Sequence, residues 1–185
     1  MILPILAYGD PVLKKKCTDI TKDYSNLNKL INDMYATMDK AHGVGLAAPQ
    51  IGKPIRLFIV DASGFEDEYP DTADFVQTFI NPVIIEESGT EWAFNEGCLS
   101  IPGIREDVMR KPTIVVQYFD EDWELIEEEF DGIIARIIQH EYDHIEGKLF
   151  VEHLSSFNRT MLRGKLNDIT AGKVEVNYRM KFPKK

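Results

Sequence analysis

The six residues QHEYDH, at positions 139–144, combine residue types that bind a metal ion and move a proton. If this segment is helical, His140 and His144 lie one turn apart on the same face, so both imidazoles can reach one ion. Glu141 is rotated by about 100° from His140, so its carboxylate can reach a water molecule at the ion without binding the ion itself. This pattern is typical of metal-assisted hydrolysis. The alternative is a pair of core histidines with ordinary hydrogen bonds, which burial of the segment disfavours.

A catalytic metal site needs a third protein ligand and an open position for water. Downstream, Glu152 and His153 lie just past the expected helix, where exposure to solvent is the simpler expectation. Upstream, the segment NEGCLSIPG contains Cys98, and a thiolate is a strong ligand for zinc or ferrous iron. Alone, Cys98 would be read as a small buried hydrophobic residue, the role expected for Cys17. Together with the two histidines, it is the favoured third ligand.

The composition favours one domain over residues 1–185, since 44% of the residues are apolar and the length suits a single core. There is no run of about 20 apolar residues and no signal peptide, and two cysteines are too few for a disulfide framework, so we expect a cytoplasmic protein. The net charge of −10 disfavours a general nucleic-acid binder, because most of the surface would repel phosphate. Residues 159–185 differ, because they contain eight Lys or Arg and two Asp or Glu, a net charge of +6.

Hydrophobic periodicity predicts three helices, of which the second carries QHEYDH and is apolar nearly all round, as in a protein core. The expected helices span 25–43, with Ser25 as cap and Gly43 as end, 132–146, with Asp131 as cap and Gly147 as end, and 155–168. Strands are predicted in PIRLFIVDA (54–62), FINPVIIEESG (79–89), the acidic hairpin 113–132 and KVEVNYRMKF (173–182). Residues 61–78 are expected to form an exposed acidic loop.

Three segments resemble the signature motifs of the peptide deformylases, in the right order: GVGLAAPQ (43–50), EGCLS (96–100) and QHEYDH (139–144). The resemblance extends to LAYGDPVL, FINP and LSIPG. It implies a hydrolase that removes the formyl group from the N-terminal formylmethionine of newly synthesised proteins and releases formate. The expected fold is α+β, with mostly antiparallel sheets packed around a buried central helix that carries the His-Glu-x-x-His motif.

The resemblance also implies a role for individual residues. Cys98, His140 and His144 would bind the metal, and Glu141 would be the general base. The side-chain amide of Gln50 and the backbone N–H of Leu99 would stabilise the oxyanion. The residues expected to contact substrate are Gly43, Val44, Gly45, Phe94, Glu96, Gly97, Arg105, Ile133 and Ile137.

One divalent ion per chain is implied, with Fe²⁺ the usual native metal of the family and Zn²⁺, Ni²⁺ or Co²⁺ as other possibilities. The implied partners are N-formylmethionyl nascent peptides and the ribosome near its exit tunnel, which the basic segment 159–185 would contact through phosphate groups. No DNA or membrane partner is expected.

Two segments depart from the compact pattern of the family. The loop near residues 64–74 is longer, and the chain closes with a predicted strand where some members have a helix. Neither difference is expected to touch the chemistry. Two other functions stay open at this point: a zinc peptidase that cuts internal peptide bonds, which Cys98 as third ligand disfavours, and a metal-stabilised binding module without catalysis, which gives Glu141 and Gln50 no role.

Overall fold

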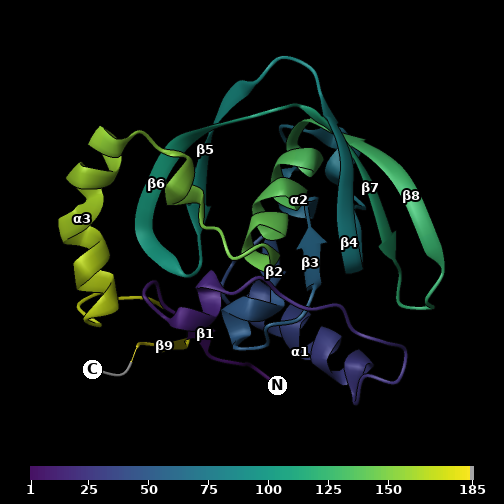
Figure 1. Ribbon diagram of the computed structural model, residues 1–185, viewed down its shortest axis with the longest axis horizontal. Helices are drawn as coiled ribbons and strands as arrows, with labels where there is room; N and C mark the ends of the chain where they lie inside the picture. Colours follow the sequence, from purple (N-terminus) through teal and green to yellow (C-terminus); the bar gives the residue numbers. More distant parts are fainter. Residues whose placement is uncertain (184–185) are drawn as a thin grey trace.

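Helix α2 (Gly132–Ile145) carries the His-Glu-x-x-His motif and runs through the middle of the protein in the computed structural model, which describes residues 1–183 (Figure 1). Ten of its 14 residues are buried, because isoleucines lie on several of its faces. It starts after Asp131, which has extended backbone, and it ends before Gly147, whose φ of +75° closes the helix. Asp131 occupies the cap position, as predicted. Among the described residues, however, its side chain makes no capping hydrogen bond.

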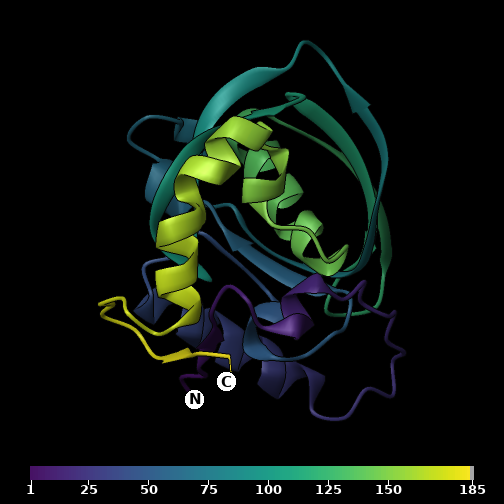
Figure 2. The same cartoon turned by 60° about the vertical axis from the view of Figure 1, so that its left-hand side comes forward.

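A five-stranded antiparallel sheet, ordered β2-β3-β4-β7-β8, packs against one side of α2. Alternating apolar side chains face the helix, and a core cluster joins Phe58, Phe79 and Val116 of the sheet to Ile134 and Ile138 of α2. Figure 2 shows the strands curving around the helix. The strands span Gly45–Ala47 (β2), Leu57–Asp61 (β3), Val76–Ser88 (β4), Thr113–Phe119 (β7) and Leu125–Asp131 (β8).

A separate antiparallel hairpin, β5 (Trp92–Cys98) and β6 (Ile101–Arg110), lies on the other side of α2 (Figure 1). Its regular register ends with Gly97 opposite Arg105, and after an irregularity Cys98 pairs with Ile101. Leu99 and Ser100 therefore form the turn that joins the two strands. This turn places Cys98 at the end of a strand, facing α2.

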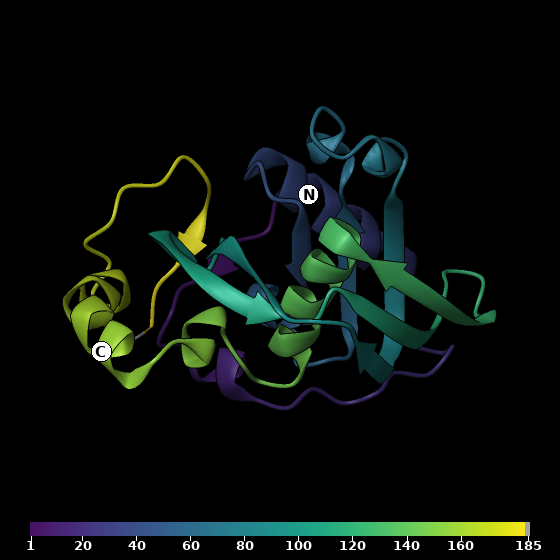
Figure 3. The ribbon, with the colours of Figure 1, turned by 90° about the horizontal axis from the view of Figure 1, so that it is seen from above.

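The remaining elements close the two ends of the molecule. Helix α1 (Leu27–Lys40) packs against the face of the sheet opposite α2, and helix α3 (Ser156–Thr170) lies outside the β5-β6 hairpin (Figure 3). The first and last strands, β1 (Ile5–Leu6) and β9 (Met180–Lys181), pair in parallel. Short 3₁₀ helices span Pro11–Lys14, Ala48–Ile51, Ser63–Phe65, Pro70–Thr72 and Phe150–His153.

The predicted α+β fold with antiparallel sheets is confirmed, as are the acidic hairpin and the third helix. The ends of the first helix were predicted wrongly. Asn26, with a φ of 60°, occupies the cap position in place of Ser25. At the other end, the helix stops at Lys40, and His42 adopts the positive φ expected of Gly43. The final strand is shorter than predicted, although half-buried and exposed residues alternate from Val174 to Phe182 as expected.

None of the helices within residues 1–183 is long and apolar enough to cross a membrane.

Replacing Ile138 with alanine should lower the free energy of unfolding by about 2–5 kcal/mol, because the fully buried side chain leaves a cavity between α2 and the sheet. Denaturant unfolding measures the change. Ile85→Ala is the matched control, since Ile85 is 50% exposed and should cost much less. Equal losses in both variants would contradict the packing described for α2.

Candidate metal centre

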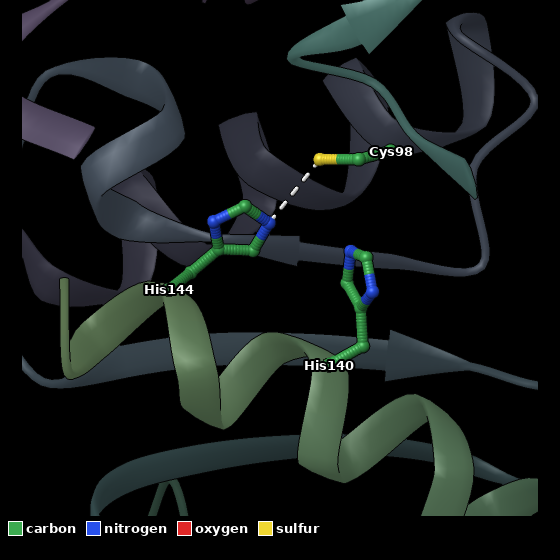
Figure 4. Close-up of side chains that lie close together, drawn as sticks. All are labelled: Cys98, His140 and His144. Carbon is green, nitrogen blue, oxygen red and sulfur yellow. Dashed lines mark hydrogen bonds between the residues drawn. The ribbon is translucent and has the colours of Figure 1, made fainter. Parts of the chain in front are cut away.

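Cys98, His140 and His144 bring one sulfur and two imidazole nitrogens within 4.8 Å of one another. The two histidines project from successive turns of α2, with ring centroids 5.1 Å apart, and Cys98 approaches from the β5-β6 turn (Figure 4). Cys98 Sγ lies 3.3 Å from His144 Nε2. The structure therefore brings together the three residues that the sequence predicted as ligands.

The charges around Cys98 suit a metal ligand. Although burial opposes ionisation, the imidazoles of His144 and His140 lower the pKa of the Cys98 thiol to about 5. The thiolate, which is the form that binds metals, is then the stable form near neutral pH. A thiolate with two imidazoles is a donor set that zinc and ferrous iron both accept, so these residues fit a divalent metal. The other cysteine, Cys17, is buried with its pKa raised to about 11, as expected of a structural thiol.

Glu96 holds the first histidine in place. Its Oε2 lies 2.9 Å from His140 Nδ1, which directs the opposite ring nitrogen away from the carboxylate. The same carboxylate accepts hydrogen bonds from Arg110 Nε at 2.7 Å and from Arg136 Nη1 at 2.9 Å. Although burial raises the pKa of Glu96, the hydrogen bonds from His140 and Arg110 lower it well below its usual range. Glu96 is therefore a buried, fully charged carboxylate behind the metal ligand.

A second carboxylate continues this network. Asp143 Oδ2 accepts a hydrogen bond from Arg110 Nη1 at 2.8 Å and lies 2.7 Å from His153 Nε2. His153 is thus turned toward Asp143, and Glu152 accepts the N–H of Leu149 at 2.9 Å. Neither downstream residue belongs to the metal-binding group found among the described residues.

Glu141 is buried beside the ligands, with 4% of its surface exposed. Burial raises the pKa of its carboxyl to about 7, although the neighbouring His140 and His144 oppose this change. Its Oε2 has no hydrogen-bond partner among residues 1–183. A buried carboxyl with a pKa near neutrality and a free oxygen suits a group that accepts a proton and returns it.

The Gln50 side chain is oriented toward the Cys98 turn. Its Oε1 accepts the N–H of Ala47 at 2.8 Å, so its Nε2 points to Cys98 Sγ at 3.5 Å and Ser100 Oγ at 3.2 Å. The amide is nearly fully buried at the end of the loop that follows β2. Leu99 lies between Cys98 and Ser100, so both predicted oxyanion donors border the metal ligands.

These residues line a cavity of about 760 Å³, a size typical of small-ligand sites. Nearly all the predicted substrate residues border it: Gly43, Val44, Gly45, Phe94, Glu96, Gly97, Arg105 and Ile137. Ile133 is not among the residues that line this cavity, and its role in substrate binding stays a prediction. It lies one turn further from His140 than Ile137, and both isoleucines pack in the core cluster formed with the sheet.

Two of the glycines are required by contacts inside the site. A Cβ atom at Gly45 would overlap the Glu141 carboxylate, and one at Gly43 would lie 2.8 Å from Leu99 Cδ1. The sequence predicted that these glycines contact the substrate. The structure adds that they leave room for the Glu141 side chain and for the turn that contains Leu99.

Several residues of the site were missed from the sequence. Arg136 precedes His140 by four residues on α2, so a lone cation in an otherwise apolar helix was an available signal. Arg110 and Tyr178 had no such signal, because their contacts join elements far apart in the chain. The two segments expected to be remote from the chemistry both reach the cavity: Phe65 from the long loop, and residues 175–178 from the C-terminal segment.

The sequence matches the family described as Polypeptide deformylase over residues 2–160. A peptide deformylase of Christiangramia forsetii is 57% identical over 190 aligned residues, covering 99% of this chain and 97% of the relative. A peptide deformylase of Flavobacterium johnsoniae is 56% identical, covering 98% and 96% respectively.

Solved structures give the same result. A peptide deformylase from Legionella pneumophila superimposes with a TM-score of 0.81 at 37% identity, covering 94% of this chain and 98% of that one. The Met-Ala-Ser bound structure of a peptide deformylase from Acinetobacter baumannii gives a TM-score of 0.77 at 37% identity, covering 83% and 99%.

Glu96→Gln should weaken metal binding about 10- to 100-fold, because the carboxylate that holds His140 is lost. It should also lower the free energy of unfolding by about 3–5 kcal/mol, since Arg110 and Arg136 lose their buried counter-charge. Competition with a chromogenic chelator measures the affinity, and denaturant unfolding measures the stability. Glu129→Gln, on the exposed face of β8, is the control and should change neither. Wild-type affinity in the Glu96 variant would contradict the role described for Glu96.

Proposed function

Because the chain belongs to the polypeptide deformylase family, we propose that it hydrolyses the formyl group of N-formylmethionyl nascent peptides with Glu141 as the base that activates water. The chain is therefore an enzyme, a peptide deformylase by family, and the family is one of metalloenzymes. The observation that carries the residue assignment is the convergence of Cys98, His140 and His144 beside a buried Glu141 with a free oxygen.

We assign the metal to Cys98, His140 and His144. A divalent ion bound there would supply Lewis acidity, which makes a water molecule easier to deprotonate and polarises the formyl oxygen. We propose Fe²⁺ as the native ion, one per chain, with Zn²⁺, Ni²⁺ or Co²⁺ as substitutes. The thiolate and imidazole donors support a soft-to-borderline metal of this kind.

The chain's own residues account for the proton transfers. Glu141 takes a proton from water, and the water oxygen forms a bond to the formyl carbon. The side-chain N–H of Gln50 and the backbone N–H of Leu99 donate to the developing oxyanion. Glu141 then returns the proton to the amine nitrogen as the carbon–nitrogen bond breaks. The products are formate and a peptide with a free N-terminus.

The cavity supports binding of a methionine side chain next to the ligands. Val44, Phe94 and Ile137 supply an apolar lining, and the Phe94 ring stands edge-on to Phe65, with centroids 6.5 Å apart. The Acinetobacter baumannii relative is described as bound to Met-Ala-Ser, and we infer that this chain takes a peptide of the same kind. Gly43, Gly45 and Gly97 would border its backbone, and Arg105 would meet it further along.

Glu141→Ala should lower kcat by at least about 100-fold, because the group that moves the proton is gone. The substrate is a formyl-Met-Ala-Ser peptide, formate release is the assay, and the protein is purified without oxygen to protect iron and thiolate. Metal content should equal that of the wild-type enzyme, since Glu141 is not a ligand. Loss of the metal in this variant would contradict the assignment. Absence of formate release by the metal-loaded wild-type enzyme would contradict the proposed function itself.

We also propose that the chain forms one domain and works in the cytoplasm. We further propose that it docks on the ribosome through the basic segment 159–185. Within the described part of this segment, Arg159, Arg163 and Lys165 are exposed on α3, where they are free to meet phosphate groups. Lys184 and Lys185 belong to the same segment but lie outside the described residues.

Reversing the charges of Arg159, Arg163 and Lys165 to glutamate should abolish co-sedimentation with ribosomes at low salt, because phosphate contacts depend on these cations. The affinity of the wild-type protein should fall steeply as salt increases. Activity on a short free peptide should not change, since none of the three residues lines the cavity. Unchanged co-sedimentation would eliminate this docking mode.

A further inference from the structure

The C-terminal segment forms part of the cavity wall. Glu175, Val176, Asn177 and Tyr178 border the same cavity as the metal ligands. The segment is held there by the pairing of β9 with β1, in which Ile5 N–H bonds to Arg179 O and Ala7 N–H to Lys181 O, both at 2.9 Å. The wall is thus fixed to the start of the chain (Figure 1).

Tyr178 makes a direct connection to the turn that carries the cysteine ligand. Its hydroxyl donates a hydrogen bond of 2.7 Å to the backbone oxygen of Leu99. The Tyr178 ring is partly buried and packs in the same apolar cluster as Leu99. A short hydrogen bond from a side chain held by packing limits rotation of the Leu99 peptide groups.

The neighbouring residue of the turn is held from other directions. Ser100 O accepts the N–H of Tyr8 at 2.8 Å, and Ser100 Oγ accepts from Gln50 Nε2 at 3.2 Å. Tyr8 follows β1, so the two successive carbonyls of the turn are bound by the first and the last segments of the described chain. Only the Leu99 carbonyl depends on Tyr178.

We propose that Tyr178 is a positioning residue for deformylation: by holding the Leu99 carbonyl, it fixes the Cys98-Leu99-Ser100 turn and aims the Leu99 N–H at the reacting oxygen. This inference rests on the proposed function. Leu99 contributes through its backbone N–H and carbonyl, so a substitution of the Leu99 side chain does not test this role. A donor that is misplaced by a fraction of an ångström stabilises the transition state less, while the binding of the substrate's methionine is unaffected.

The test is Tyr178→Phe in the metal-loaded enzyme, with formyl-Met-Ala-Ser as substrate. Removing only the hydroxyl should lower kcat about 10-fold and leave KM within about twofold, with kcat calculated per folded, metal-loaded enzyme so that a general loss of stability does not contribute. Amide hydrogen exchange in a peptide spanning residues 97–101 should become faster, because the turn loses one of its hydrogen bonds. Metal content should equal that of the wild-type enzyme.

Tyr118→Phe is the matched control. Its hydroxyl bonds to Glu128 at 3.1 Å on the β7-β8 hairpin, and Tyr118 does not line the cavity. This variant should keep wild-type kcat and wild-type exchange at 97–101. Wild-type kcat in Tyr178→Phe would overturn the inference. If the wild-type enzyme releases no formate, the proposed function fails. The hydrogen-exchange measurement still tests the contact between Tyr178 and the turn. Unchanged exchange in Tyr178→Phe would overturn that contact, and faster exchange would support it.

Discussion

A buried negative charge at Glu96 determines how the parts of this enzyme fit together. A carboxylate that is removed from water must be paired and hydrogen-bonded, because an isolated buried charge is very costly. Here three partners come from two elements: Arg110 from β6, and Arg136 and the ring of His140 from α2. If the β5-β6 hairpin separated from α2, one carboxylate and two guanidinium groups would therefore lose some of their hydrogen-bond partners.

The same constraint explains the metal centre. α2 carries His140 and His144 and the hairpin carries Cys98, so this candidate site exists only if the hairpin is held at a definite height along the helix. Glu96 lies two residues before Cys98 on β5 and bonds to His140, which belongs to the same candidate metal-binding group as Cys98. Arg136 adds a second fixed point one turn before His140, and its guanidinium lies over the Trp92 ring at 4.6 Å. The ligand geometry thus follows from charge pairing around Glu96 as much as from the ligands themselves.

The sequence predicts those parts of the site that depend on local spacing or on a short motif. His140, Glu141 and His144 follow from helical periodicity, and Cys98 follows from the need for a third ligand together with the resemblance to the family. Residues whose role depends on contacts between distant segments were not predicted. Arg110 reaches Asp143 on α2 from the end of strand β6, and Tyr178 reaches Leu99 from the C-terminal segment. Helical spacing does not separate Ile133 from Ile137, because both pack in the core cluster formed with the sheet, and of the two Ile137 also borders the cavity.

The parallel pairing of β1 with β9 has a consequence for how the enzyme is made. Ile5 lies opposite Met180, so nearly the whole described chain must be translated before this pair can form. Gln50, Cys98, His140, Glu141 and His144 all emerge from the ribosome earlier than Tyr178 and the strand that holds it. Contacts of such high sequence separation are also slow to form, because closing a long loop costs entropy before the contact compensates for it. In a newly made copy of this protein, the C-terminal part of the cavity wall is therefore the last part of the site to be synthesised.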